Sequence, residues 1–235
     1  MLNKTPLLVG ILFLCIILGT AKTAEAAVTS GAIKAVTSAS TQPCTLAVVF
    51  ENGYNTINKT ASTNFTVSIK IYNPPEGIGQ FCVGLKWDPS ALALKTGTSA
   101  DVVEGTWMPH FGATIYSVGA INNTGGTINQ ISDALTTYLP GATGAGTMFT
   151  VAFHAQALSP VANITIRSPN TATTYLLNAS LDGVVNIDAV VDGSVIVIPE
   201  FSASALLPLF LVATTIAIAA ATVSSRKRRI PFRLS

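Results

Sequence analysis

The sequence is poor in charged residues and lacks a recognisable catalytic motif. Only 10% of its 235 residues are Asp, Glu, Lys or Arg, and only two are His. Neither His110 nor His154 belongs to an H-E-x-x-H, G-x-S-x-G or Cys–His arrangement, so the common protease and hydrolase signatures are absent. The scarcity of acids and aromatics also argues against a glycosidase cleft with paired carboxylates. We expect neither enzyme activity nor a cofactor.

Calcium-binding motifs are also missing. The aspartates are scattered, and no D-x-D-x-D-G loop of the EF-hand type occurs. We expect the following to cap turns rather than bind metal: Asp88, Asp101, Asp133, Asp182, Asp188 and Asp192.

The body of the chain has no net positive charge. The formal net charge is +2, but residues 27–200 hold six Lys and Arg against ten Asp and Glu, a net charge of −4. The remaining excess of cations lies largely after residue 225. A mildly acidic body has no electrostatic footprint for nucleic acid, so we exclude a nucleic-acid partner.

The two ends of the chain are apolar. Residues 1–26 read as a signal peptide, with Lys4, an apolar centre at 7–18 and an A-x-A cleavage site at 24–26. Residues 27–43, rich in Ala, Thr and Ser, read as a flexible linker.

A second apolar run lies near the C-terminus. Residues 203–223 carry no charge and would span about 31 Å as a helix, which is enough to cross a bilayer. The cations at 226–229 then predict a cytoplasmic tail, residues 226–235, by the positive-inside rule. We therefore expect a single-pass membrane protein whose body lies outside the cell.

Between these ends, short segments alternate apolar and polar residues. Phe81, Val83, Leu85 and Trp87 share one parity, which predicts a strand with one face in a core. Other expected strands cover 45–50, 64–72, 114–118, 127–131, 147–156, 162–167, 184–187 and 194–198. Gly, Asn and Asp turns separate them, and no long helical period occurs. The pattern predicts one all-β domain, a two-sheet jelly-roll sandwich of about nine strands, over residues 44–198.

The strand that contains Phe81 and Trp87 resembles part of a known protein family. It ends in Trp87-Asp88-Pro89, followed by Ser-Ala-Leu, and this ending resembles cohesin modules, the β-sandwiches first known from cellulosome scaffolds. The resemblance continues in the Gly-x-Ile strand at 126–131, the Phe-x-Val-x-Phe strand at 146–153 and the closing strand at 191–197. Residues 142–145 depart from it, where a cohesin often has a more polar loop.

The resemblance implies a binding function. A cohesin uses one flat sheet face to bind a dockerin, a small paired-helix calcium module on another protein. Carried over to this sequence, that face includes Gln80, Lys86 and Asn129.

Two other functions remain open. A carbohydrate-binding module, with a polysaccharide as its ligand, would use Trp107, Phe111 and Tyr116 as sugar contacts. Trp107 could equally plug one end of the sandwich. A structural role as a glycosylated envelope protein is the third hypothesis.

The segment at 199–225 resembles a sorting signal. Ile-Pro-Glu-Phe-Ser at 198–202, just before the apolar run, is similar to the Pro-Glu-Phe tails of archaeal surface proteins. Ser202 and Ala203 depart from that pattern, in which Pro often follows Phe.

Two kinds of covalent modification are expected outside the cell. Once the signal peptide is removed, Cys44 and Cys82 are the only cysteines, and an even count favours a disulfide between them. Five Asn-x-Ser/Thr sequons lie in the body: Asn58, Asn64, Asn122, Asn163 and Asn178. Of these we expect Asn58 and Asn122 to lie in turns, where acceptors are most accessible.

Overall fold

The computed structural model describes residues 43–137, 140–199, 212, 214–216 and 218. The expected signal peptide, the linker up to residue 42 and the basic tail lie outside these residues. The expected membrane span overlaps them only at five helical positions between 212 and 218. Within the part that is described, no helix has the length and apolar character needed to cross a membrane.

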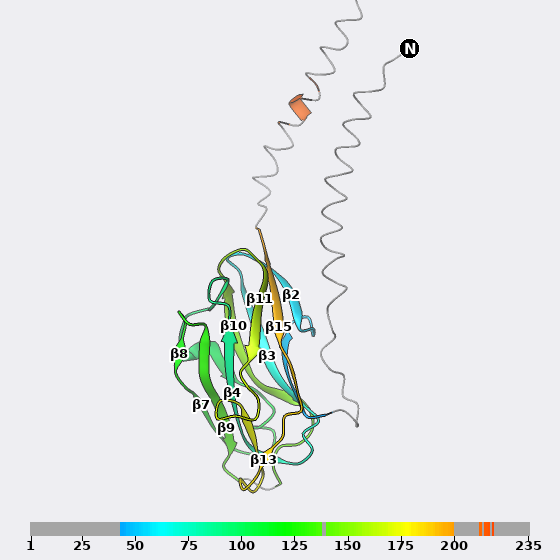
Figure 1. Ribbon diagram of the computed structural model, residues 1–235, viewed down its shortest axis with the longest axis vertical. Helices are drawn as coiled ribbons and strands as arrows, with labels where there is room; N and C mark the ends of the chain where they lie inside the picture. The colour runs from blue at the N-terminus through cyan, green and yellow to red at the C-terminus, as the bar shows by residue number, and fades with distance from the viewer. Residues whose placement is uncertain (1–42, 138–139, 200–211, 213, 217, 219–235) are drawn as a thin grey trace, which may run out of the picture. The chain divides into compact units, whose positions relative to one another are not determined.

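The described chain is a sandwich of two β-sheets (Figure 1). The first sheet has the order β14-β1-β3-β10-β5, with β6 also paired to β10. Its strands are β1 (Thr45–Phe50), β3 (Asn64–Tyr72), β5 (Leu92–Leu94), β6 (Val102–Glu104), β10 (Gly146–Ala155) and β14 (Ala189–Val191). A short 3-10 helix, η1 (Ser99–Asp101), precedes β6.

The second sheet carries the candidate site. Its order is β13-β12-β4-β11-β15-β2, and β9 pairs with β4, β7 and β8. Its strands are β2 (Thr56–Thr60), β4 (Ile78–Trp87), β7 (Thr114–Val118), β8 (Ile121–Asn122), β9 (Thr127–Leu135), β11 (Ser159–Ile166), β12 (Tyr175–Asn178), β13 (Val184–Val185) and β15 (Gly193–Ile198).

Alternation of apolar and polar residues produces these strands. In β3, Phe65, Val67, Ile69 and Ile71 are at most 4% exposed, while the residues between them face outward. Because successive side chains point to opposite faces, this pattern gives each sheet one apolar face. The two apolar faces pack on each other as in other β-sandwiches.

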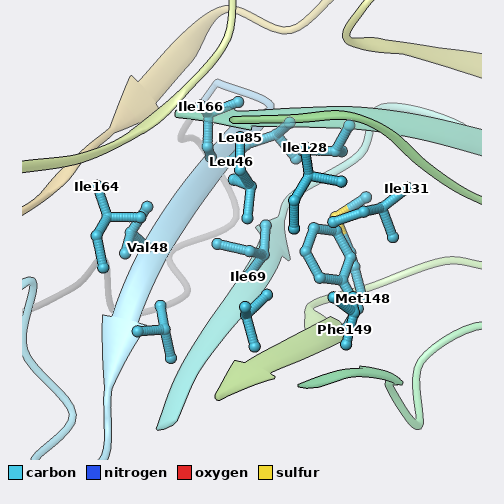
Figure 2. Packing of buried hydrophobic residues seen from close by; sticks show 14 of the residues in the cluster. Leu46, Val48, Ile69, Leu85, Ile128, Ile131, Met148, Phe149, Ile164 and Ile166 are labelled. Atoms are coloured by element: carbon cyan, nitrogen blue, oxygen red, sulfur yellow. The ribbon is translucent and has the colours of Figure 1, made fainter. Parts of the chain in front are cut away.

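The core lies between the sheets. Figure 2 shows Leu46, Val48 and Ile69 of the first sheet beside Leu85 and Ile128 of the second. Aromatic rings add to it: Phe81 of β4 stacks on Phe149 of β10 with ring centroids 6.1 Å apart. The main cluster of buried apolar residues runs from Cys44 to Val197.

This sandwich is self-contained. The compact unit covers Ala32–Pro199, and every described strand and the whole core cluster lie inside it. A unit with its own core is expected to fold alone.

The all-β sandwich predicted from the sequence is confirmed. Nine described strands have five residues or more, and six shorter ones accompany them. β1, β3 and β7 have the predicted bounds. Six strands were not predicted. Of these, β2 pairs in parallel with β15 and β12 pairs with β4, and the other four are the short strands β5, β6, β8 and β14.

Candidate functional site

The outward side of the second sheet is the candidate site, and its first row is apolar. Cross-strand pairing places Ile115, Ala134, Gln80, Leu177 and Val184 side by side across β7, β9, β4, β12 and β13. Ile115 and Val184 are each 65% exposed. Four of the five side chains in this row are therefore apolar, and Gln80 lies between them.

The next row across the sheet has four residues, and a loop covers part of it. Ser117, Ser132, Cys82 and Tyr175 are paired across β7, β9, β4 and β12. The Sγ atom of Cys82 lies 3.7 Å from the backbone carbonyl of Thr173. The loop between β11 and β12 therefore covers this part of the outer face.

A β-bulge follows. Val83 pairs with Ile131 and Leu85 with Ile128, so Asn129 and Gln130 together lie opposite Gly84. Both bulged residues are exposed, and this breaks the simple alternation along β9.

Arg167 lies across the space above Gly84. A Cβ atom on Gly84 would come within 3.2 Å of the Arg167 side chain, so the missing side chain leaves room for the arginine stem. The Arg167 guanidinium donates a hydrogen bond of 2.8 Å to Oδ1 of Asn129. The glycine thereby lets an arginine from the end of β11 reach β9.

The far end of the face holds a second cation. Lys86 is exposed and pairs with Thr127 on β9 and Thr165 on β11. A hollow of about 420 Å³ beside it is lined in part by Val161 and Asn163.

The structure places Gln80, Lys86 and Asn129 on this one outward surface, as the resemblance implied. Sequence reasoning missed Arg167, together with the apolar residues on β12 and β13. Arg167 directly follows the apolar alternation of β11, and this position was the only signal for it.

The expected sugar contacts do not form an exposed aromatic strip. Trp107 is only 4% exposed, and its indole N–H donates to the carbonyl of Thr143 at 3.1 Å. Tyr116 packs against the core with its hydroxyl buried. Phe111 is 36% exposed, but its neighbouring ring is His110, which meets it edge-on at 5.2 Å. Trp107 belongs to the core cluster, which agrees with the packing role that its sequence allowed.

The predicted disulfide is wrong. Cys44 and Cys82 are both buried free thiols. Cys44 belongs to the core between the sheets, whereas Cys82 points to the outer side of the second sheet. Side chains on opposite sides of a sheet cannot meet the geometry of a disulfide. Burial, followed by the nearby Asp188, raises the pKa of Cys44 to about 11, and burial raises the pKa of Cys82.

We therefore expect both thiols to be unreactive in the folded domain. A maleimide reagent should label neither cysteine in native buffer and both in denaturant without reductant, as read by intact mass. Buried, protonated thiols react slowly because the thiolate is the nucleophile. Labelling in denaturant that requires a reductant would contradict the structure.

The sequons lie in different surroundings. Asn58 is in β2, not in the predicted turn, but its side chain is exposed. Asn122, also exposed, begins the turn after β8 and accepts a hydrogen bond from the N–H of Gly125. Asn178 is held by its own turn, because its amide donates to Asp182 at 2.8 Å. Glycosylation stays a prediction, with Asn58 and Asn122 the most accessible of these three acceptors.

Asp133 does not cap a turn, contrary to expectation. It is completely buried in β9, and neither carboxyl oxygen has a hydrogen-bond partner among the described residues. Burial, and then the neighbouring Glu104 of β6, raises the pKa of Asp133 to about 7. The hydroxyl of Thr114 donates to Glu104, which leaves that donor unavailable to Asp133. The Asp133 carboxyl is therefore not accessible from solvent.

Metal ligands do not converge in the part of the chain that is described: no group of three His, Cys, Asp or Glu side chains could hold an ion there.

No protein-family model and no curated protein matches the sequence. Solved structures do match the fold. A type II cohesin domain of Acetivibrio cellulolyticus aligns with a TM-score of 0.51 and 14% identity, over 66% of this chain and 95% of that one. A chain from a type II cohesin–X–dockerin complex of the same organism aligns with a TM-score of 0.50 and 18% identity, over 65% and 99%.

An archaeal structure is also similar. The non-cellulosomal cohesin of Archaeoglobus fulgidus gives a TM-score of 0.49 and 16% identity, over 68% of this chain and 94% of that one. At these identities the likeness concerns the fold and not the function. The chain has the fold of cohesin domains.

Proposed function

We propose that this domain is a non-catalytic docking module that binds a dockerin-type protein through the outer face of its second sheet. The observation that carries the proposal is the placement of Gln80, Lys86 and Asn129 together on that face, beside an exposed apolar row. The cohesin-fold structure that aligns at 18% identity comes from a complex with a dockerin. A flat polar face with a few apolar residues suits a protein partner, whereas a sugar-binding face would need exposed aromatic rings.

Binding assays with defined dockerin-type modules test this function. The domain, residues 32–199, would be immobilised and titrated with each module in calcium and in EDTA, with affinity read by surface plasmon resonance. We expect calcium-dependent binding that Lys86→Ala and Asn129→Ala each weaken by roughly 5- to 30-fold. Lys95→Ala, on an exposed residue next to β5 of the other sheet, is the matched control and should bind as the wild type does.

Two results would overturn the proposal. If no module binds, or if the Lys95→Ala variant weakens as much as the face variants, the outer face is not a dockerin site. Binding of a polysaccharide that Phe111→Ala abolishes would support a carbohydrate-binding module instead.

We further propose that the docking module is displayed on the outer side of a membrane. The uncharged run at 203–223 and the cations at 226–229 support this orientation. External protease added to intact cells should release the domain and leave a C-terminal epitope tag protected. Protection of the domain, or digestion of the tag, would contradict this topology.

A further inference from the structure

The outer face of the second sheet is polarised along β4. The apolar row lies level with Gln80. The two cations are Arg167, which lies level with Gly84, and Lys86, which belongs to β4 itself. Lys86 is six residues beyond Gln80, a separation of about 20 Å along a strand. This length corresponds to about 13 residues of helix.

We infer that the partner's contact helix is acidic at one end and apolar at the other. The inference rests on the proposed docking function and adds the chemistry of the partner. Apolar side chains of the helix would cover the row around Gln80. Its carboxylates would meet Arg167 about 9 helix residues away, at the level of Gly84, and Lys86 about 13 residues away.

The apolar end offers a shaped site. Beside β12 and β13, a hollow of about 430 Å³ is lined by residues 170–172 with Tyr175, Leu177 and Val184. Val184 is 65% exposed at this hollow, and Ile115 is equally exposed at the other end of the row. Burying such side chains against a partner contributes favourable free energy that polar residues on this row would not.

The cationic end lacks acidic partners. Residues 43–199 contain five Lys and Arg and nine Asp and Glu. Two of these five cations, Lys86 and Arg167, lie on the outer face, and neither forms an ion pair with a described residue. None of the outward positions on β4, β7, β9, β11 and β12 carries a carboxylate.

The nearest acids are engaged in hydrogen bonds. Asp88, which lines the same hollow as Lys86, accepts hydrogen bonds from Ser90. Asp192 accepts one from the N–H of Ile166, next to Arg167, and Asp182 accepts one from Asn178. An acidic domain thus presents a face that attracts acidic partners, and complementary charge of this kind steers association and sets specificity.

Arg167 is positioned in advance to bind a carboxylate. Its stem rests over Gly84, and one N–H donor is held by Asn129 at 2.8 Å. Four of the five guanidinium donors remain without a partner among the described residues. An arginine held in this way loses little conformational entropy when its planar fork takes up a carboxylate.

A selection experiment tests the inference. The probe is a yeast-displayed library of paired-helix calcium modules in which the exposed helix positions encode Asp, Glu, Lys, Arg and apolar residues without bias. Selection on residues 32–199 should enrich helices with Asp or Glu about 9 to 13 residues from an apolar cluster. Their affinity should fall roughly 10-fold with Lys86→Glu and with Arg167→Glu, and should weaken as salt is raised.

Controls separate charge from misfolding. Lys95→Glu makes the same charge change away from the face and should leave affinity unchanged. A selected helix with one carboxylate changed to lysine should regain affinity for the Lys86→Glu or Arg167→Glu domain, which a merely unfolded variant could not do.

The outcomes are distinguishable. Enrichment of Lys or Arg at the contact helix, or affinities insensitive to both charge reversals, would overturn the inference and leave docking intact. The absence of any enriched module would overturn the docking function, and the inference with it.

Discussion

Replacing Phe153 by alanine is expected to destabilise the domain by roughly 3–5 kcal/mol. Phe153 is fully buried in β10 of the first sheet. Its ring stacks on Phe65 of β3, with centroids 5.8 Å apart, and meets Trp87 of β4 edge-on at 5.5 Å. The ring therefore joins the two sheets, and its removal leaves a cavity that rigid strands can only partly close.

Chemical denaturation measures this effect. The free energy of unfolding of residues 32–199 would be obtained from urea titrations of the wild type, Phe153→Ala and Phe153→Leu. The leucine variant should lose less, since it refills part of the cavity. Phe111→Ala is the matched control, because that ring is 36% exposed, and it should cost less than about 1 kcal/mol. Equal losses at Phe153 and Phe111 would refute the assignment of Phe153 to the core.

The second large effect that we expect on stability concerns Asp133. Its pKa is raised from 3.8 to about 7 in the folded domain, by burial first and by Glu104 second. The folded state therefore keeps a proton that the unfolded state loses, so this group's contribution to stability decreases as pH rises from about 4 to 7. Asp133→Asn removes the titration. We expect this variant to be more stable than the wild type at pH 8 by roughly 2–4 kcal/mol, and the difference to shrink towards pH 4.

Another buried aspartate supplies the control. Asp101 is 4% exposed, but its Oδ2 accepts hydrogen bonds from both the N–H and the hydroxyl of Thr96 and from the N–H of Gly97. Asp101→Asn should therefore destabilise the domain, by roughly 1–3 kcal/mol at pH 8. Urea titrations at pH 4, 6 and 8 compare the two variants. A destabilised Asp133→Asn domain at pH 8 would contradict the buried, unpartnered carboxyl.

Local alternation was sufficient to predict the strands whose two faces differ. β3 has the predicted bounds because its apolar residues recur every second position without interruption. β1 also has them, but it is a short apolar run that is buried on both faces. β2 was missed because its sequence, Thr-Ile-Asn-Lys-Thr, has turn-like composition. It becomes a strand by pairing in parallel with β15, more than 130 residues later. No local sequence pattern predicts such a long-range contact.

Contacts between residues far apart in the sequence also limited the prediction of the site. The parity that puts Phe81 and Val83 in the core leaves Cys82 on the outer side of β4, but the loop that buries it comes from about 90 residues further along the chain. The bulge at Asn129 and Gln130 shifted the alternation in β9, and Asp133 came to lie inside the sandwich. Gln80, Lys86 and Asn129 were predicted through the family resemblance, whereas Arg167 depends on a tertiary contact over Gly84.

The place of β15 in the second sheet bears on how this domain withstands tension. β15 is hydrogen-bonded on both sides, antiparallel to β11 and parallel to β2, and it is the last described strand. A pull on that end acts along the strand and across its hydrogen bonds, so several must shear together instead of peeling one by one. β11 in turn pairs with β4, which carries the outer face. In the membrane-anchored docking module that we propose, force between the partner and the anchor would thus pass through β4, β11 and β15 of one sheet.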